Sequence, residues 1–355
     1  MASVVLVTGV CTPLGARVAA ELHAAPGVRR VIGVDSVPAR LELARQLTGV
    51  PFVRADIRNP LIATVIDTEG VDTIVHLSVT PSPAASGGRS AMKEMNVIGT
   101  MQLLAAAQKS ETVRRLVVKS TTAVYGSSSR DPAMFTEDHE PAGPPKSGYA
   151  KDAAEVEGYV RGFARRRPDV SVAILRYANI VGPTLDSPLT RYLMLPVVPT
   201  ILGYDPRIQA IGEDDAVAVL RRAVVRDLPG VVNVAAAGIV TLSQAIRRAG
   251  RISVPVPVQA ADAVSRVLRG TGRVDFTPDQ ARVLTFGRAV DTTRLRTDFG
   301  YPPRLSTVQA LDEFIRGRGL RPIIDADAVS RTVAGAVSIL AGARSARAGR
   351  PAADA

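Results

Sequence analysis

The chain has 355 residues, of which 46% are hydrophobic, and it carries a formal net charge of +11 with a pI near 10.3. Because a single hydrophobic core stops growing near roughly 250–300 residues, this length predicts one dominant domain and a smaller lobe. No segment approaches the ~20 apolar residues of a membrane-spanning helix, and the first residues lack a basic leader, so we expect a cytoplasmic protein. The single cysteine, Cys11, excludes an internal disulfide, and three scattered histidines predict no metal site.

The positive charge favours anionic partners but does not choose among phosphorylated ligands, acidic lipids and nucleic acid. Arginine runs such as residues 165–167 are not interleaved with aromatic residues, and no nucleic-acid-binding motif is present. We interpret these runs as solvated helix faces and expect no nucleic-acid partner.

Short apolar, β-branched runs alternate with helical patterns through the first half of the chain. Continuously apolar strands joined by helices predict an α/β fold with a Rossmann-type, doubly wound parallel sheet. The predicted strands are residues 4–7, 31–34, 52–53, 73–77, 116–118 and 172–175.

The second half of the chain has a different pattern, with less regular alternation and several prolines after about residue 182. We therefore predict a dinucleotide-binding domain over residues 1–182 and a smaller C-terminal substrate-capping lobe over residues 183–319. The segment 231–235 reads as a strand that returns to the main sheet. Residues 320–355 are expected to form a C-terminal helix and a flexible tail.

The first predicted strand runs into a turn containing Gly9 and Gly15, which is followed by a helix. A strand, a glycine turn and a helix N-terminus together form a favourable place for a pyrophosphate. Within this turn, Thr12 is also a good N-cap residue and Pro13 a good first helical residue, a reading that needs no ligand. The two readings are compatible.

Asp35 ends the second predicted strand. A carboxylate there can accept hydrogen bonds from both adenosine ribose hydroxyls and would repel a 2′-phosphate, which favours NAD over NADP. The alternative is a strand-end aspartate that caps the helix after it.

Four further motifs follow in order: VHLS at 75–78, NVIGT at 96–100, KSTTAVYG at 119–126 and RYANIVGP at 176–183. Together with the glycine turn, they resemble the extended short-chain dehydrogenase/reductase family, in its NAD-dependent epimerase/dehydratase branch. The resemblance covers roughly residues 3–183 and extends more loosely to about residue 315. The turn resembles the family's T-G-x-x-G-x-x-G loop, with Thr12 in place of the middle glycine, and added bulk there is expected to weaken phosphate binding.

The resemblance implies NAD as cofactor, a nucleotide-sugar-like molecule as ligand, and a homodimer. It places Asp56 beside the adenine, Thr121 in the Ser/Thr role of the active site, and Tyr149 at the catalytic tyrosine. The family's lysine, four residues after the tyrosine, is replaced by Ala153. Lys151 is about 200° around the helix from Tyr149 and is no simple substitute.

Each assigned residue also has a purely structural reading. Tyr149 could be a packed aromatic residue at a helix start, and Thr121 a strand-end hydroxyl bonded to backbone. The resemblance implies that Asn179 contacts a substrate diphosphate and that Arg207 meets a nucleotide phosphate. Asn179 could equally be a turn residue, and Arg207 a surface charge.

Two functions remain open from the sequence. The first is an NAD-dependent epimerase, dehydratase or reductase of nucleotide sugars whose redox turnover is weak or absent because the lysine is missing. The second is a non-catalytic regulatory or scaffold protein that binds NAD and a nucleotide sugar. The apolar residues of segment 329–344 recur at helical spacing between arginines, so this segment could lie peripherally on acidic lipid or pack on the protein body.

Overall fold

The computed structural model describes residues 3–79, 87–139, 145, 148–260 and 278–323. Seven parallel strands form the main sheet, in the order β11-β6-β5-β4-β1-β2-β3. The order reverses between β1 and β4, as in a doubly wound sheet, which confirms the predicted fold class. The strands of the sheet are β1 (Ser3–Thr8), β2 (Val28–Asp35), β3 (Phe52–Arg54), β4 (Thr73–His76), β5 (Arg115–Thr121), β6 (Ser171–Tyr177) and β11 (Gly230–Val234).

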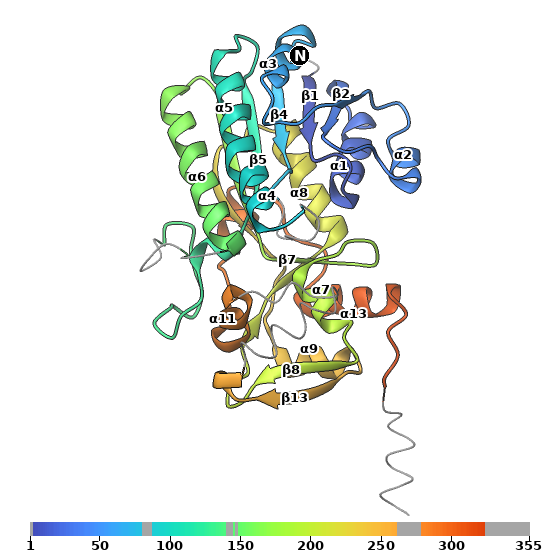
Figure 1. Cartoon of the computed structure of the whole chain (residues 1–355), viewed down its shortest axis with the longest axis vertical. Coiled ribbons are helices and arrows are strands. Elements are labelled where there is room, and N and C mark those ends of the chain that lie inside the picture. The colour runs from blue at the N-terminus through green and yellow to red at the C-terminus, as the bar shows by residue number, and fades with distance from the viewer. Residues whose placement is uncertain (1–2, 80–86, 140–144, 146–147, 261–277, 324–355) are drawn as a thin grey trace, which may run out of the picture.

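Helices cover both faces of this sheet (Figure 1), which is why its central strands are apolar on both sides. One face packs against α1 (Pro13–His23), α8 (Glu213–Val225) and α12 (Thr293–Thr297). The other face packs against α3 (Leu61–Thr68), α5 (Gly99–Lys109) and α6 (Gly148–Arg166). The remaining helices around the sheet are α2 (Leu41–Gln46), α4 (Arg89–Lys93), the π-helix η2 (Glu94–Ile98) and the 3₁₀-helix η3 (Thr122–Tyr125).

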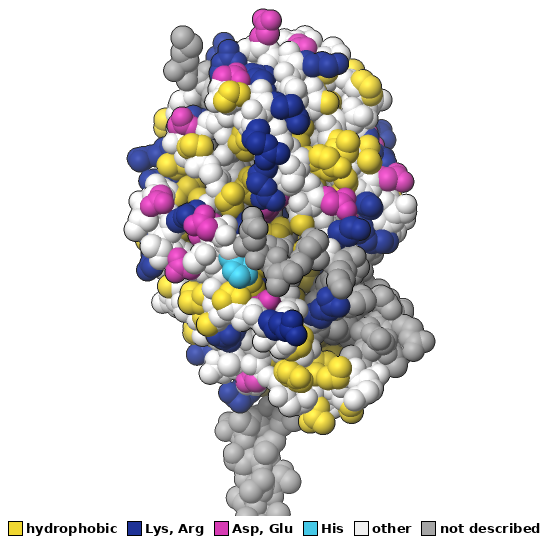
Figure 2. Space-filling view, turned by 90° about the vertical axis from the view of Figure 1, so that its left-hand side faces the viewer, with side chains coloured by type: hydrophobic (Ala, Val, Ile, Leu, Met, Phe, Trp, Pro, Cys, Tyr) yellow, Lys and Arg dark blue, Asp and Glu magenta, His cyan; other side chains and the backbone are white. Residues whose placement is uncertain are grey.

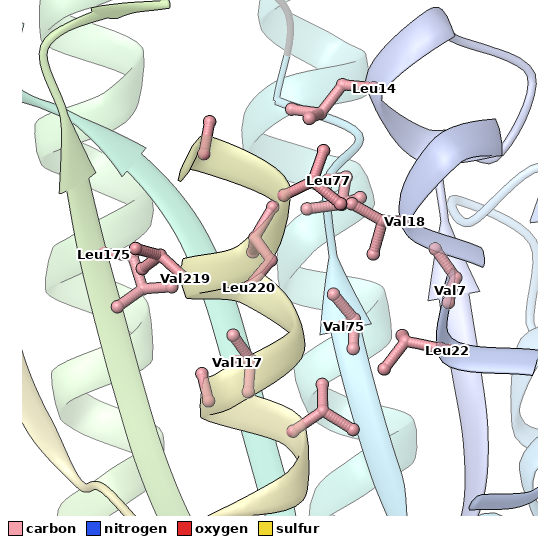
Figure 3. Close-up of a cluster of buried hydrophobic side chains, with 14 of the residues drawn as sticks. Val7, Leu14, Val18, Leu22, Val75, Leu77, Val117, Leu175, Val219 and Leu220 are labelled. Atoms are coloured by element: carbon pink, nitrogen blue, oxygen red, sulfur yellow. The ribbon is translucent and has the colours of Figure 1, made fainter. Parts of the chain in front are cut away.

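Figure 3 shows the core between the sheet and the helices α1 and α8. Leu14, Val18 and Leu22 recur on one side of α1, because residues four apart in a helix share a face. They join strand residues such as Val7 and Val75 in one buried cluster. This packing fixes the start of α1 at the carboxyl edge of the sheet.

A smaller lobe lies beyond that carboxyl edge and has its own core (Figure 1). Three two-stranded sheets contribute to it: β7 (Asn179–Val181) with β10 (Ala210–Gly212), β8 (Val197–Ile201) with β13 (Ile252–Val256), and β9 (Arg207–Ile208) with β12 (Val240–Thr241). Its helices among the described residues are α7 (Pro188–Leu193), α9 (Leu242–Arg248), the 3₁₀-helix η4 (Val258–Ala260), α11 (Pro278–Phe286) and α13 (Thr307–Gly317).

The surface in Figure 2 carries Lys and Arg side chains in several separate groups, with acidic and hydrophobic side chains between them. Among the described residues, no helix is both long and apolar enough to cross a bilayer. The segment 329–344, for which the sequence allows a membrane contact, lies outside the described residues.

Candidate functional site

The turn after β1 is built around a glycine in the left-handed conformation. Gly9 has φ of 73°, which costs a glycine nothing sterically. The Thr12 hydroxyl donates a hydrogen bond to the Gly9 carbonyl oxygen at 2.8 Å and accepts one from the Gly15 amide at 3.1 Å. Thr12 is therefore the N-cap of α1, as the sequence predicts, with Pro13 as the first helical residue. The positive end of the helix dipole lies at the carboxyl edge of the sheet.

The last and the middle positions of this turn, Gly15 and Thr12, meet different steric constraints. A Cβ at Gly15 would lie 2.1 Å from the Gly9 carbonyl oxygen, so only glycine fits there. Thr12 has φ of −98° and an exposed side chain, so a side chain at this position strains no backbone. The departure from the family loop thus leaves the turn intact.

Asp35 lies at the end of β2, next to this turn. It accepts hydrogen bonds from the amides of Cys11 at 3.0 Å and Val37 at 3.4 Å. Partial burial raises the pKa of its carboxyl group despite these hydrogen bonds. The next helix, α2, starts after Arg40 rather than after Asp35, so Asp35 does not cap that helix. Its carboxylate instead connects the strand end to the glycine turn.

Asp56, after β3, is held by a neighbouring arginine. The Arg58 guanidinium donates to both carboxylate oxygens at 2.6–3.1 Å, and the Arg58 amide donates at 2.9 Å. These contacts lower the pKa of Asp56. Arg58 also reaches Glu94 in η2 at 3.1 Å, which ties the end of β3 to that helix.

Thr121 and Tyr149 come together at the carboxyl edge of the sheet, although 28 positions separate them in the chain. Thr121 ends β5 and Tyr149 is the second residue of α6, and their hydroxyls are hydrogen-bonded. Burial raises the pKa of Tyr149, and the nearby Asp152 raises it further, against the opposing effect of the Thr121 hydroxyl. Thr121 also accepts a hydrogen bond from the Ala123 amide, which is the bond to backbone that its structural reading expects. The tyrosine is therefore fully protonated near neutral pH.

An ion pair that the sequence analysis missed lies one turn along α6 from this tyrosine. Asp152 is completely buried and accepts two hydrogen bonds from Arg89 of α4, each 2.7 Å long. Arg89 also donates to the Gly148 carbonyl oxygen at 3.0 Å. The guanidinium is thus engaged in holding the start of α6 and gives no hydrogen bond to the Tyr149 hydroxyl.

The position of the family's lysine is apolar in this chain. Ala153 is buried in a cluster with Val124, Tyr125 and Phe135, so a longer cationic side chain there would place its ammonium group among these residues. Lys151 is half-exposed and lies 3.9 Å from Glu155, on the far side of the helix, as expected.

A second buried ion pair, between α6 and β6, contacts the end of β5. Arg176 of β6 donates to Glu157 of α6 at 2.7–3.2 Å, and Ser120 donates to the same carboxylate at 2.6 Å. Arg176 also donates to the Tyr125 hydroxyl at 2.8 Å. An arginine inside an otherwise apolar strand indicates that a buried charge needs a partner, but it does not identify Glu157 as that partner.

The predicted ligand contacts of the second half lie in the smaller lobe and at its junction with the sheet. Asn179 is the first residue of β7 and is half-buried. Arg207 is exposed at the start of β9 and lines a cavity of about 230 Å³ together with Arg288, Asp131 and Phe286. Arg288, which the sequence analysis did not single out, donates to the Gly126 carbonyl oxygen at 2.8 Å. The cavity therefore begins directly after the KSTTAVYG motif.

Known proteins resemble this chain in sequence and in fold. An uncharacterized protein of Mycobacterium tuberculosis is 50% identical over 322 residues, which covers 91% of this chain and 86% of the relative. The dTDP-glucose 4,6-dehydratase of Bacillus anthracis, solved in complex with NAD, has a TM-score of 0.69 at 19% identity, covering 90% of this chain and 97% of that chain. The UDP-glucose 4-epimerase of Thermotoga maritima, solved with UDP-glucose, has a TM-score of 0.68 at 21% identity, covering 88% of this chain and 98% of that chain.

A comparison of the sequence with models of protein families identifies the family of this chain. Residues 5–198, more than half of the chain, match the model described as the NAD dependent epimerase/dehydratase family. This range contains the glycine turn, the Thr121–Tyr149 pair and Asn179, and the description names the cofactor that the sequence predicts. The chain belongs to the NAD dependent epimerase/dehydratase family.

Proposed function

We propose that this protein binds NAD and a nucleotide-sugar-like molecule at the carboxyl edge of its sheet, and that its redox turnover is weak or absent. The observation that carries this proposal is the hydrogen-bonded Thr121–Tyr149 pair, whose tyrosine has a raised pKa and lacks the family's neighbouring lysine. Such a site keeps the two hydroxyls that contact a substrate oxygen and loses the means to ionise one of them.

The residues present fit the cofactor. Gly9 and Gly15 close a tight turn at the N-terminus of α1, where backbone amides and the helix dipole favour a pyrophosphate. Asp35, beside this turn, is the residue we propose for the adenosine ribose hydroxyls, and Asp56 the one beside the adenine. When bound, NAD supplies a hydride acceptor or donor.

The chemistry of Tyr149 follows from its protonation. A protonated phenol donates a hydrogen bond to a substrate oxygen but takes no proton from a hydroxyl near neutral pH. General acid–base help contributes roughly 10²–10⁴-fold to a reaction rate, so the absence of an effective base affects turnover strongly. Substrate binding through Tyr149 and Thr121 is unaffected.

Arg207 and Arg288, which line the same cavity, favour a phosphorylated ligand. We propose that Arg207, on the rim of the 230 Å³ cavity, pairs with a ligand phosphate, and that the Asn179 amide contacts the same diphosphate. The neighbour of known structure from Thermotoga maritima holds UDP-glucose, which is the ligand chemistry proposed here.

A non-catalytic role in regulation or as a scaffold is the second candidate. It is favoured by Ala153, which packs in an apolar cluster where the enzymes of the family need an ammonium group. A peripheral membrane contact through residues 329–344 is a prediction that belongs to this candidate, whereas the homodimer implied by the family resemblance is a prediction under either candidate.

Calorimetry with NAD, NADP and UDP-glucose, followed by assays of NADH formation and epimer interconversion, tests the proposal. We expect NAD to bind at least about tenfold more tightly than NADP, because Asp35 would face the 2′-phosphate. The preference for NAD over NADP should fall in Asp35→Ala, whereas the control Asp67→Ala, at an exposed position of α3, should retain it. Turnover should be very slow, and Tyr149→Phe should change it little. Equal affinities for the two cofactors, or robust turnover, would contradict the proposal.

A further inference from the structure

Lys119 is a cation within the apolar face of the sheet that the proposed function does not use. It is the fifth residue of β5, whose residues Leu116, Val117 and Val118 are all buried. Side chains alternate between the two faces of a strand, so Lys119 shares the face of Val117, which packs toward α1 and α8. Its register partner on β6, Leu175, belongs to the same buried cluster.

The Lys119 ammonium has no acidic partner in the part of the chain that the structure describes. Among the residues that the structure describes, none forms an ion pair or accepts a hydrogen bond from it. Burial lowers its pKa to about 8, and its charge contributes to the low pKa of His76, about 4. A largely buried lysine without a counter-charge costs folding free energy, which makes a purely structural role unfavourable.

Lys119 lies close to the candidate site on the same strand. It precedes Thr121 by two residues, so both side chains leave β5 on the same face, roughly 7 Å apart along the strand. A cofactor that exchanges a hydride with a molecule held by Thr121 and Tyr149 has its nicotinamide ring beside this pair. Lys119 therefore lies on the same sheet face as Thr121, next to the place we propose for that ring.

We propose that Lys119 makes the site selective for the redox state of its cofactor, so that NADH binds in preference to NAD⁺. The nicotinamide ring of NAD⁺ carries a positive charge and that of NADH carries none, so a nearby ammonium group weakens only the oxidised form. This inference rests on the proposed binding of NAD. It also assigns the site a resting state in which the bound cofactor is reduced.

Near neutral pH, the titratable groups around Lys119 do not change their charge, so the charge of Lys119 itself is the one that varies. His76 on β4 is neutral there, and burial raises the pKa of Tyr177 on β6 and of Tyr149 on α6. The neighbouring side chains of α1 and α8 in this cluster are apolar. At the start of α8, Glu213 accepts hydrogen bonds from Thr184, and Asp215 from Arg304.

The test is the ratio of the dissociation constants of NAD⁺ and NADH, measured by calorimetry on the full chain. Lys119→Met removes the charge and retains the length of the side chain, and we expect it to lower the ratio by about tenfold. The matched control is Lys151→Met, which removes an equal charge from the outer side of α6 and should leave the ratio unchanged. In the wild-type protein, the ratio should fall as pH rises from 7 to 9.5 and the ammonium group deprotonates, and this trend should disappear in Lys119→Met.

The outcomes separate this inference from the proposed function. If both cofactor forms bind and Lys119→Met leaves the ratio within twofold of wild type at pH 7, the inference is overturned and NAD binding stands. If Lys119→Met is unstable, a pH-independent ratio in the wild-type protein overturns it in the same way. If neither form binds, the proposed function fails and the inference fails with it.

Discussion

The two halves of the proposed site differ in what forms them: one is formed mainly by backbone and the other mainly by side chains. The half around Gly9 and Gly15 is formed by backbone, through a left-handed glycine, a helix cap and a close backbone contact. The half around Tyr149 is formed by side chains, some in ion pairs such as Arg89 with Asp152 and one, Lys119, without an acidic partner among the described residues. A backbone site tolerates an exposed side chain that strains no backbone, as at Thr12. A site made of side chains changes its chemistry when one cation is absent, as at Ala153.

The first prediction concerns the buried charges under the second half. Glu157→Gln leaves Arg176 without its carboxylate partner, and we expect a loss of about 3–5 kcal/mol in the free energy of unfolding. Denaturant unfolding measures this change. The control is Glu155→Gln on the same helix, whose half-exposed pair with Lys151 is worth at most about 0.5 kcal/mol. Similar effects of the two substitutions would mean that the buried pair does not support the site.

The second prediction concerns His76, which lies at the boundary between the halves. Its ring is hydrogen-bonded to Thr8 at 2.8 Å, directly before the glycine turn, and to Thr100 of α5 at 2.9 Å. Burial lowers its pKa to about 4, below the value of about 6.5 expected in the unfolded chain. The unfolded state therefore binds more protons between these pH values, and stability falls as pH decreases through this range.

This loss should reach on the order of 3 kcal/mol by pH 4 in the wild-type protein. His76→Gln removes the titrating ring and should lack this part of the stability loss, while the carboxylates titrate in both proteins. The measurement is the difference in unfolding free energy between the two proteins from pH 7 to pH 4. A constant difference would show that His76 is protonated in the folded state.

The sequence predicts the backbone half of the site better than the half that is made of side chains. The strand positions, the cap at Thr12 and the turn at Gly9 follow from local patterns, because glycine, proline and apolar periodicity act on neighbouring residues. The Arg89–Asp152 and Glu157–Arg176 pairs depend on residues 63 and 19 positions apart, and no local pattern specifies such contacts. Thr121 and Tyr149 could be selected only through the family resemblance, and their hydrogen bond required the folded chain.

The third prediction tests the backbone half. Gly15→Ala places a Cβ against the Gly9 carbonyl oxygen, and we expect a loss of about 2–3 kcal/mol in stability together with weaker NAD binding. Gly158→Ala is the matched control, because this glycine lies exposed in α6 with no atom within 4 Å of the new Cβ. It should stabilise the protein by about 0.5–1 kcal/mol, since alanine is the better helix former. Thermal unfolding and NAD calorimetry on both variants distinguish crowding at the turn from a general effect of the added methyl group.

The smallest expected effect is at Thr12, where the two readings of the glycine turn make opposite contributions. Thr12→Gly removes the side-chain cap of α1, which costs only a few tenths of a kcal/mol because glycine is itself an acceptable N-cap residue. The same change restores the family's middle glycine and opens space for phosphates near the helix start. We therefore expect NAD to bind a few-fold more tightly while stability falls slightly. Thr12→Ser, which retains the capping hydroxyl and removes only the methyl group, should give an intermediate affinity with unchanged stability. If Thr12→Gly weakens NAD binding, the threonine hydroxyl contributes to the cofactor site, and the departure from the family loop is an adaptation for binding instead of a cost to it.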